Sequence, residues 1–323
     1  MNSLHYFIPR NKLYSFAMYH LLEHVLAKKI QDHINSNGTF SGSIFNAETF
    51  LDGINIDIYN TDYAAINGLK EVLLNINLST LDDRIIRQEA EVISNEVLDT
   101  DMLEEELSFH KIFEYIDGEK ISCMNQTDFN YNEFLAFSFE ALSSAAMVLR
   151  FDNTIKKLRN PYWEPLSYPK HVEGIEGKFI IGAYIQIPKS VDDIFESMVA
   201  SYLLGQRDDS IIQLNYMRKH GLYIGYSQHL AYRNALIVTY LMETNESLLL
   251  SYSRPFIPHC KQVEAENIYK ELCTYFLYSD PLYTMFSRMF AKINSEELSF
   301  CISEIPIRIK TAIHKFIDAG GAS

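Results

Sequence analysis

The stretch Tyr19-His20-Leu21-Leu22-Glu23-His24 lies inside a segment, from about Asn11 to His33, whose apolar residues recur at helical spacing. In a helix, positions i and i+4 lie one above the other, and position i+3 lies beside them. His20 and His24 can therefore direct an imidazole nitrogen at one metal ion, with Glu23 beside that ion. This order, His-x-x-Glu-His, reverses the common zinc motif His-Glu-x-x-His.

A second predicted helix, which begins after Ser79-Thr80, offers carboxylates to the same site. A catalytic zinc ion takes three protein ligands and keeps one position open for water, so two histidines need a further ligand. Glu89 and Glu96 are seven positions apart and therefore share one face of that helix. Because their stripe is otherwise apolar, and buried carboxylates need a partner or a metal, the pair indicates a charged site opposite.

Each of these residues also has a plainer interpretation. His20 and His24 can be ordinary core or surface histidines, because the motif is short. Taken alone, Glu89 and Glu96 fit a solvated helix face better. A zinc-stabilised binding module is a further alternative. Structural zinc sites normally have four protein ligands, often including cysteine, and the four cysteines (positions 123, 260, 273 and 301) lie elsewhere in the sequence.

Taken together, the motifs resemble those of the pitrilysin and mitochondrial-processing-peptidase family of zinc metallopeptidases, the inverzincins. Members carry His-x-x-Glu-His and, further along the chain, a pair Glu-x6-Glu whose second Glu binds zinc. Here 71 residues lie between His24 and Glu96, slightly fewer than usual, and six lie between Glu89 and Glu96. The resemblance implies that Glu96 is the third zinc ligand, that Glu23 activates the water, and that Glu89 orients a ligand histidine.

One segment between the two zinc motifs resembles the family's substrate-pairing strand. The family has Asn-Ala-x-Thr on a sheet-edge strand that pairs with the substrate backbone, and this chain has Asn46-Ala47-Glu48-Thr49. The resemblance therefore implies that Asn46, Ala47 and Thr49 bind the substrate.

The second half of the chain resembles the family more weakly. Leu203-Leu204-Gly205 and the segment from Arg218 to Leu222 are similar to a family helix and to the entry of a strand that carries a substrate-contacting Arg and Tyr. Arg218 matches that Arg, but Ile224 stands where the Tyr is expected. Tyr223 or Tyr226 is the substitute that we expect, with Tyr226 as our choice.

The resemblance implies an α+β fold of two similar-sized αβ domains of the mitochondrial-processing-peptidase type, which form one half of a clamshell. We expect a zinc-binding domain over residues 1–155 and a second domain over residues 175–323. A linker rich in proline and glycine, at about 156–174, is expected between them. The expected function is a zinc-dependent endopeptidase subunit, with Zn²⁺ as cofactor, that hydrolyses small peptides or precursor and leader peptides inside a dimeric chamber. The partner would be a second copy or a related subunit. The alternative is a non-catalytic scaffold or regulatory subunit, against which the intact metal and base positions argue.

Composition narrows the class of partner. The formal net charge is −14 and basic residues cluster only in pairs, which argues against a nucleic-acid partner. No secretory signal precedes the first helix, and the apolar stretch Leu13–Leu26 is too short to cross a bilayer. We therefore expect a cytoplasmic protein that does not bind membranes.

Elsewhere the residue patterns predict a mixture of strands and helices. Ile54, Ile56 and Ile58 alternate with Asn55 and Asp57, which predicts a half-buried strand within the strand region Thr39–Tyr59. The other predicted strands are Leu4–Ile8, Ala145–Phe151, Phe179–Ile187, Leu222–Ser227 and Ala235–Met242, and the other predicted helices are Tyr63–Leu74, Glu104–Tyr115, Tyr131–Leu142, Val191–Leu204, Gln262–Tyr278 and Pro306–Ile317.

Overall fold

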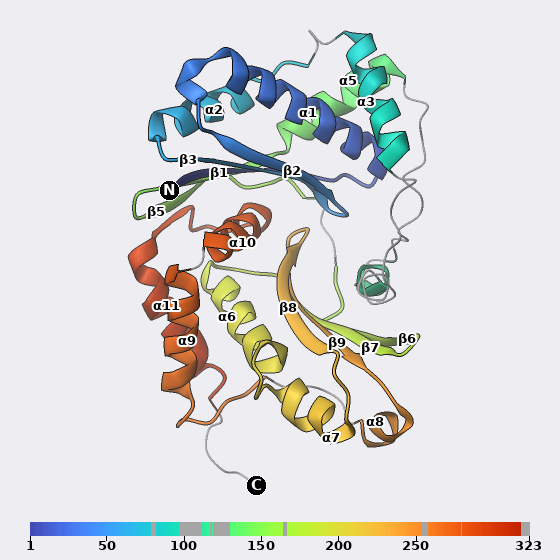
Figure 1. The fold of residues 1–323 in the computed structure, drawn as a ribbon, viewed down its shortest axis with the longest axis vertical. Coiled ribbons are helices and arrows are strands. Elements are labelled where there is room, and N and C mark those ends of the chain that lie inside the picture. The colour runs from blue at the N-terminus through green and yellow to red at the C-terminus, as the bar shows by residue number, and fades with distance from the viewer. Residues whose placement is uncertain are drawn as a thin grey trace.

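Two antiparallel β-sheets, with helices around them, organise the chain (Figure 1). The computed structural model describes residues 1–78, 82–96, 111–116, 118, 130–163, 167–252, 258–278 and 280–317, without the side chains of residues 94–96, 251 and 276–283. The predicted mixed α/β class is confirmed.

The first sheet has six strands in the order β10-β5-β4-β1-β3-β2. Its strands are β1 (Asn2–Pro9), β2 (Ile44–Phe50), β3 (Gly53–Asn60), β4 (Ala146–Phe151), β5 (Thr154–Arg159) and β10 (Ser299–Cys301). One face of this sheet carries the helices α1 (Phe16–Ser36), α2 (Tyr63–Leu74), α3 (Asp83–Glu96) and α5 (Tyr131–Ser143) (Figure 1).

The second sheet has four strands in the order β6-β7-β9-β8. Its strands are β6 (His171–Glu176), β7 (Phe179–Gln186), β8 (Gly225–Tyr232) and β9 (Ala235–Glu243). The helices of this half are α6 (Asp192–Ser201), α7 (Arg218–His220), α8 (Glu246–Ser251), α9 (Ala265–Tyr278), α10 (Asp280–Lys292) and α11 (Ile305–His314). Helix α10 packs against β1 and β4 of the first sheet and against β8 of the second, so it joins the two.

Two segments cross between the sheets. β10, from the end of the chain, pairs with β5 in the first sheet. The helical residues 111–116, from the first half of the sequence, place Ile112, Phe113 and Ile116 in the apolar cluster of the second sheet. Neither sheet with its helices is therefore built from one half of the sequence alone, and the division into two domains stays a prediction.

The helix that carries the quoted motif begins at Phe16 rather than near Asn11. Its N-cap is Ser15, whose side chain accepts a hydrogen bond from the Met18 backbone N–H. Such a cap satisfies an N–H group that has no partner inside the helix, which fixes where the helix starts. One side of α1 is buried, through Ala17, Met18, Tyr19, Leu21, Leu22, Val25, Leu26 and Ile30.

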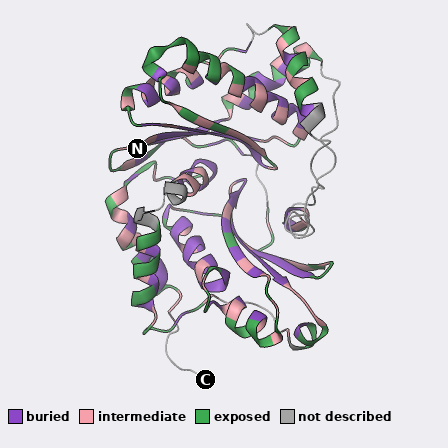
Figure 2. Cartoon of the chain, in the orientation of Figure 1, coloured by how far each residue is buried: buried purple, intermediate pink, exposed green. Residues whose placement is uncertain are grey.

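The predicted strand over Ile54–Ile58 is confirmed as part of β3, but the prediction that it is half-buried is wrong, because β3 is buried on both faces (Figure 2). The isoleucines pack in the cluster beneath the helices. Asn55 and Asp57, on the other face, are only 3% and 1% exposed. That face meets α10, whose Arg288 donates a hydrogen bond to Asp57. A polar residue in an alternating strand can therefore be buried when the chain supplies it with a partner.

Strands occupy both ends of the range expected as a linker, at about 156–174. β5 occupies its beginning and β6 occupies its end, so the connection between these strands is shorter. β5 forms a hairpin with β4, and its Ile155 is fully buried. Burial of alternate side chains in β5 outweighs the turn-forming composition of the residues that follow.

Most other predicted elements are confirmed within a few residues. β8 begins at Gly225, later than expected, and the sequence patterns missed α10. The predicted helix Glu104–Tyr115 is described only from residue 111, and Thr80 lies outside the described residues.

Candidate metal centre

His20, Glu23 and His24 lie together on α1. Their ligand atoms are all within 4.8 Å of one another, and the two imidazole ring centroids are 4.9 Å apart. The side chains are 16%, 12% and 16% exposed, so a small ligand could reach a site that is otherwise sheltered. Among the side chains that the structure describes, this is the one group of three with the chemistry of metal ligands.

The three side chains converge because the helix buries its other side. The core beneath α1 fully buries the neighbouring residues Leu21, Leu22 and Val25. The positions i, i+3 and i+4 are thereby held on one accessible strip of the helix. The two imidazoles therefore lie side by side on α1, as the spacing of His20 and His24 predicts.

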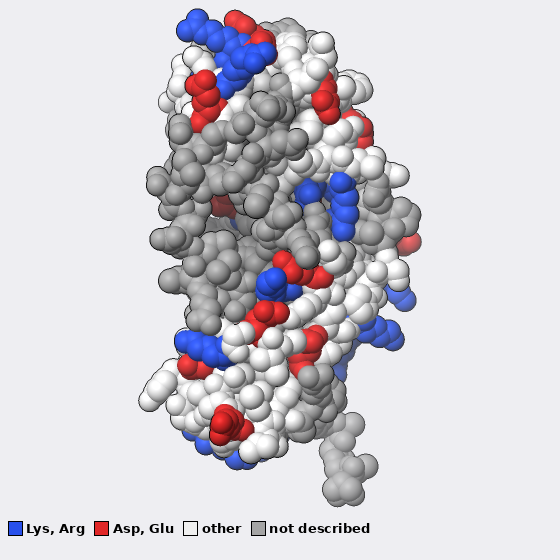
Figure 3. Space-filling model, turned by 90° about the vertical axis from the view of Figure 1, so that its right-hand side faces the viewer, with Lys and Arg blue, Asp and Glu red and all other residues white. Residues whose placement is uncertain are grey.

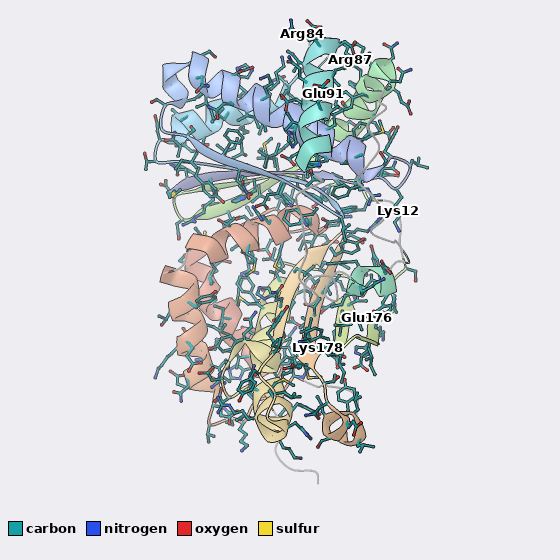
Figure 4. All side chains as sticks on the ribbon, turned by 45° about the vertical axis from the view of Figure 1, so that its right-hand side comes forward. Lys12, Arg84, Arg87, Glu91, Glu176 and Lys178 are labelled. Carbon is teal, nitrogen blue, oxygen red and sulfur yellow. The ribbon has the colours of Figure 1, made fainter. Side chains whose placement is uncertain are left out.

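Glu89 of α3 lies beside this strip. Arg84, Arg87 and Glu91 are exposed on the outer side of α3 (Figure 4), and the opposite side turns towards α1. Glu89 is 18% exposed there, and its Oε2 is 3.4 Å from Nδ1 of His24. A proton on Nδ1 that is donated to Glu89 leaves Nε2 of His24 as the nitrogen available to a metal.

Glu96, the predicted third ligand, is the last residue of α3. Its side chain lies outside the described part of the structure, so its role stays a prediction. The described donors fit zinc, because imidazole nitrogen and carboxylate oxygen are the donors of catalytic zinc sites. These donors cluster on one strip of α1, and the Glu89 carboxylate lies against Nδ1 of His24, the ring nitrogen that would not bind the ion. Both features are typical of zinc sites in proteins.

The edge strand β2 runs next to the strip. The Thr49 hydroxyl donates a hydrogen bond to Oε2 of Glu23 at 3.0 Å. β2 is the last strand of the first sheet, and within the described residues no strand pairs with its outer edge. The segment that contains Asn46, Ala47 and Thr49 therefore passes the candidate metal centre with one edge unpaired.

The backbone register shows which residues face that open edge. The Arg10 N–H donates to the Asp52 carbonyl, which continues the β1–β3 ladder beyond Pro9. Backbone groups alternate sides along a strand, so Ile54 and Ile56 direct theirs to β1, whereas Asn55 and Asp57 direct theirs to β2. In β2 the partners of these two residues, Glu48 and Asn46, therefore point inward. The backbone N–H and C=O groups of Phe45, Ala47 and Thr49 point outward.

The second-half residues with a predicted substrate role are not brought to this centre. Arg218 is the first residue of α7, and α7 and α1 lie at opposite ends of the molecule (Figure 1). Tyr226 is in β8 and packs against the apolar cluster of the second sheet. Tyr223, the alternative, is 91% exposed.

Sequence reasoning missed a polar junction between the β2–β3 hairpin and α10. Asp52, in the hairpin turn, is 2% exposed and accepts hydrogen bonds from Lys292 Nζ at 2.9 and 3.0 Å and from the Arg233 backbone N–H at 2.9 Å. Arg288, one helical turn before Lys292, bonds to Glu48 of β2 and Asp57 of β3. Arg288 and Lys292 thus fix the β2–β3 hairpin to α10, on the face of the sheet opposite α1.

Asp57 is a second buried carboxylate of this junction. Burial alone would raise its pKa, but hydrogen bonds from His5 and Arg288, together with their charges, hold the pKa of Asp57 below its usual value. Nδ1 of His5 is 2.6 Å from Oδ1 of Asp57, and Nε2 of His5 is 3.0 Å from the Ser3 hydroxyl. All three side chains are almost completely buried, so this Ser-His-Asp series is part of the packed junction.

The charge distribution on the surface and the length of the helices relate to the expectation that nucleic acids and membranes are not partners. On the face shown in Figure 3, the described Lys and Arg side chains are scattered among Asp and Glu rather than gathered into one basic surface. Among the helices that the structure describes, none has both the length and the apolar content that a bilayer-spanning segment needs.

By sequence, the chain matches no family model and no curated protein. By structure, it is similar to a protease from Helicobacter pylori (TM-score 0.59, 13% identity, 97% of this chain and 88% of that chain covered). It is also similar to a conserved protein from Enterococcus faecalis V583 (TM-score 0.51, 13% identity, 98% and 90% covered). Pitrilysin is similar as well (TM-score 0.54, 12% identity). The chain covers 41% of pitrilysin, and 96% of the chain itself is covered. The chain therefore has a mixed α/β fold similar to that of pitrilysin over most of its length.

Proposed function

We propose that this chain is the zinc-binding subunit of a peptidase. The observation that carries the proposal is the meeting of two features. Three side chains with the chemistry of a metal site have ligand atoms within 4.8 Å of one another, and a strand edge that no described strand covers is hydrogen-bonded to one of them. The similarity of fold to a protease and to pitrilysin supports it.

His20 and His24 would hold the ion, with Glu96 as the proposed third ligand. When bound there, zinc would lower the pKa of a water molecule and polarise a peptide carbonyl. Glu23 would take the proton from that water and pass it to the leaving amine, as a general base and then a general acid. Glu89 would keep the His24 ring in the orientation and tautomer that the site needs.

The substrate would be an extended peptide that adds to the outer edge of β2. Backbone pairing to Phe45, Ala47 and Thr49 gives affinity with little demand on sequence, which suits small peptides or precursor and leader peptides. Asn46 lies in the same strand, on the opposite face from Ala47.

A second subunit would complete the chamber. The chain spans less than half of pitrilysin. Arg218 is in α7, at the opposite end of the molecule from α1 (Figure 1), and Tyr226 packs against the apolar cluster of the second sheet. We propose that a second copy or a related chain packs against this one and brings its own equivalents of these residues to the substrate. A sizing experiment that finds an active monomer would contradict this assembly.

The function is tested with the unmodified protein and with Glu23→Gln. The unmodified protein should cleave a set of quenched fluorescent peptides, lose that activity to a chelator and regain it with zinc. Glu23→Gln should keep its zinc, because Glu23 is not proposed as a ligand, and should lose turnover. Peptide cleavage that survives in Glu23→Gln would remove Glu23 from this role.

A further inference from the structure

We propose that the Thr49 side chain is a positioning residue for Glu23 rather than a substrate contact. This inference rests on the proposed function, and it changes the role that the sequence resemblance gives to Thr49. Its basis is the 3.0 Å hydrogen bond from the Thr49 hydroxyl to Oε2 of Glu23, which joins the edge strand β2 to helix α1.

The alternation of β2 decides where the Thr49 side chain points. Thr49 lies opposite Ile54, and Ala47 lies opposite Ile56. Directly opposed residues of antiparallel strands carry their side chains on the same face, and both isoleucines lie in the core beneath the helices. The Thr49 hydroxyl is thus on the α1 side of the sheet, whereas its backbone groups point out along the open edge.

The chemistry of the pair suits a positioning role. A hydrogen bond to a carboxylate is charge-assisted and stronger than one between neutral groups. Threonine is branched at Cβ, so its hydroxyl has few orientations, and the sheet holds its backbone. Glutamate has several rotatable bonds, and a fixed donor on one carboxylate oxygen limits the positions that the carboxylate adopts. The same Oε2 is 3.8 Å from Nε2 of His20, so the contact also sets the distance between the base and a proposed ligand.

One consequence follows for turnover. A peptide that pairs with the Thr49 backbone binds the same residue whose hydroxyl holds Glu23. The Thr49–Glu23 hydrogen bond then links β2, which binds the substrate, to Glu23, the base that acts on the water. Loss of the hydroxyl should therefore impair the chemical step and leave peptide binding intact.

The test compares Thr49→Val with Thr49→Ser. Valine keeps the branched shape and removes the hydroxyl, whereas serine keeps the hydroxyl. We expect Thr49→Val to lower kcat roughly 10- to 100-fold, because a misplacement of about 1 Å can cost that much, with KM within about twofold of the unmodified protein. Thr49→Ser should recover most of the lost kcat. Zinc content and thermal unfolding should be unchanged in both variants.

A binding measurement separates positioning from substrate contact. Peptide Kd is measured by fluorescence anisotropy in the Glu23→Gln background, with and without Thr49→Val, so that no turnover interferes. The proposal expects equal Kd values. It is overturned if Thr49→Val keeps its kcat, if Thr49→Ser is as impaired as Thr49→Val, or if the loss appears in Kd. An unmodified protein without zinc-dependent hydrolysis would instead overturn the proposed function, and this role with it.

Discussion

Replacement of Asp52 by Asn tests whether α10 holds the edge strand. Asp52 is 2% exposed, and its main partner, the Lys292 ammonium group, is bound to both carboxylate oxygens at 2.9 and 3.0 Å. The Lys292 side chain is only 10% exposed. Asparagine keeps the shape and an acceptor for the Arg233 N–H but removes the charge, so the ammonium group is left buried without its counter-ion.

The expected cost follows from that burial. Removal of one partner of a buried ion pair costs about 3–5 kcal/mol, and the acceptor that Asn retains places Asp52→Asn at the lower end. Lys292→Met should also destabilise, because it leaves the Asp52 carboxylate with the Arg233 N–H as its described partner. The double variant should cost less than the sum of the two, by about 1–3 kcal/mol, since neither charge is then left alone.

Urea unfolding measures all three variants. The change in the midpoint, at an unchanged slope, gives the change in the free energy of unfolding. The matched control is Asp209→Asn, the same chemical change at a 57% exposed carboxylate 2.9 Å from Arg207, which should cost within about 1 kcal/mol. If Asp52→Asn costs no more than this control, or if the two single effects simply add, the argument for a buried ionic clamp is refuted.

Two further variants test the zinc site and the core. Glu89→Ala should weaken zinc binding by roughly 10- to 100-fold in a chelator competition, because the His24 ring loses the carboxylate that orients it; unaltered affinity would exclude that role. Burial lowers the pKa of Lys157 from 10.5 to about 7, so between these two values the unfolded chain binds more protons and stability rises with pH. That rise in the free energy of unfolding amounts to a few kcal/mol at most, since each pKa unit corresponds to about 1.4 kcal/mol. Lys157→Met should flatten the rise. If the free energies of unfolding of the two proteins change with pH in parallel, the prediction is contradicted.

Local patterns were enough to predict the elements that carry the candidate site. The helical spacing around His20 and His24 and the alternation of Ile54, Ile56 and Ile58 are properties of single segments, and the structure shows both elements. The position of Glu89 beside His24 could also be predicted, because a motif at a known spacing linked the two helices.

Contacts between distant segments could not be predicted from such patterns. Asp52 and Lys292 are separated by 240 positions, and neither stands in a motif. Their pairing depends on how α10 lies beneath the first sheet. The same cause hid the burial of Asp57, which the sequence places on the polar face of a strand. The missed helix α10 did carry a local signal, because Met285, Phe286, Met289 and Phe290 recur at helical spacing after Pro281 near its start.

The side-chain direction of Thr49 shows what strand alternation adds to a sequence resemblance. The sequence resemblance placed Thr49 in a substrate-pairing strand, and β2 is an edge strand. The alternation that predicts β3 also applies to β2, and it puts the Thr49 side chain on the helix side. Within this strand the backbone, and not the threonine hydroxyl, faces outward.

The central claim is that His20 and His24 hold one divalent ion together with a carboxylate from α3. Zinc-edge anomalous diffraction from crystals of the purified protein tests it most directly. We predict one peak per chain at about 2.0–2.1 Å from a nitrogen of each imidazole, with Glu96 as the third protein ligand. A zinc-loaded crystal with no peak between the two imidazoles, or with the peak at another group of side chains, would contradict the account.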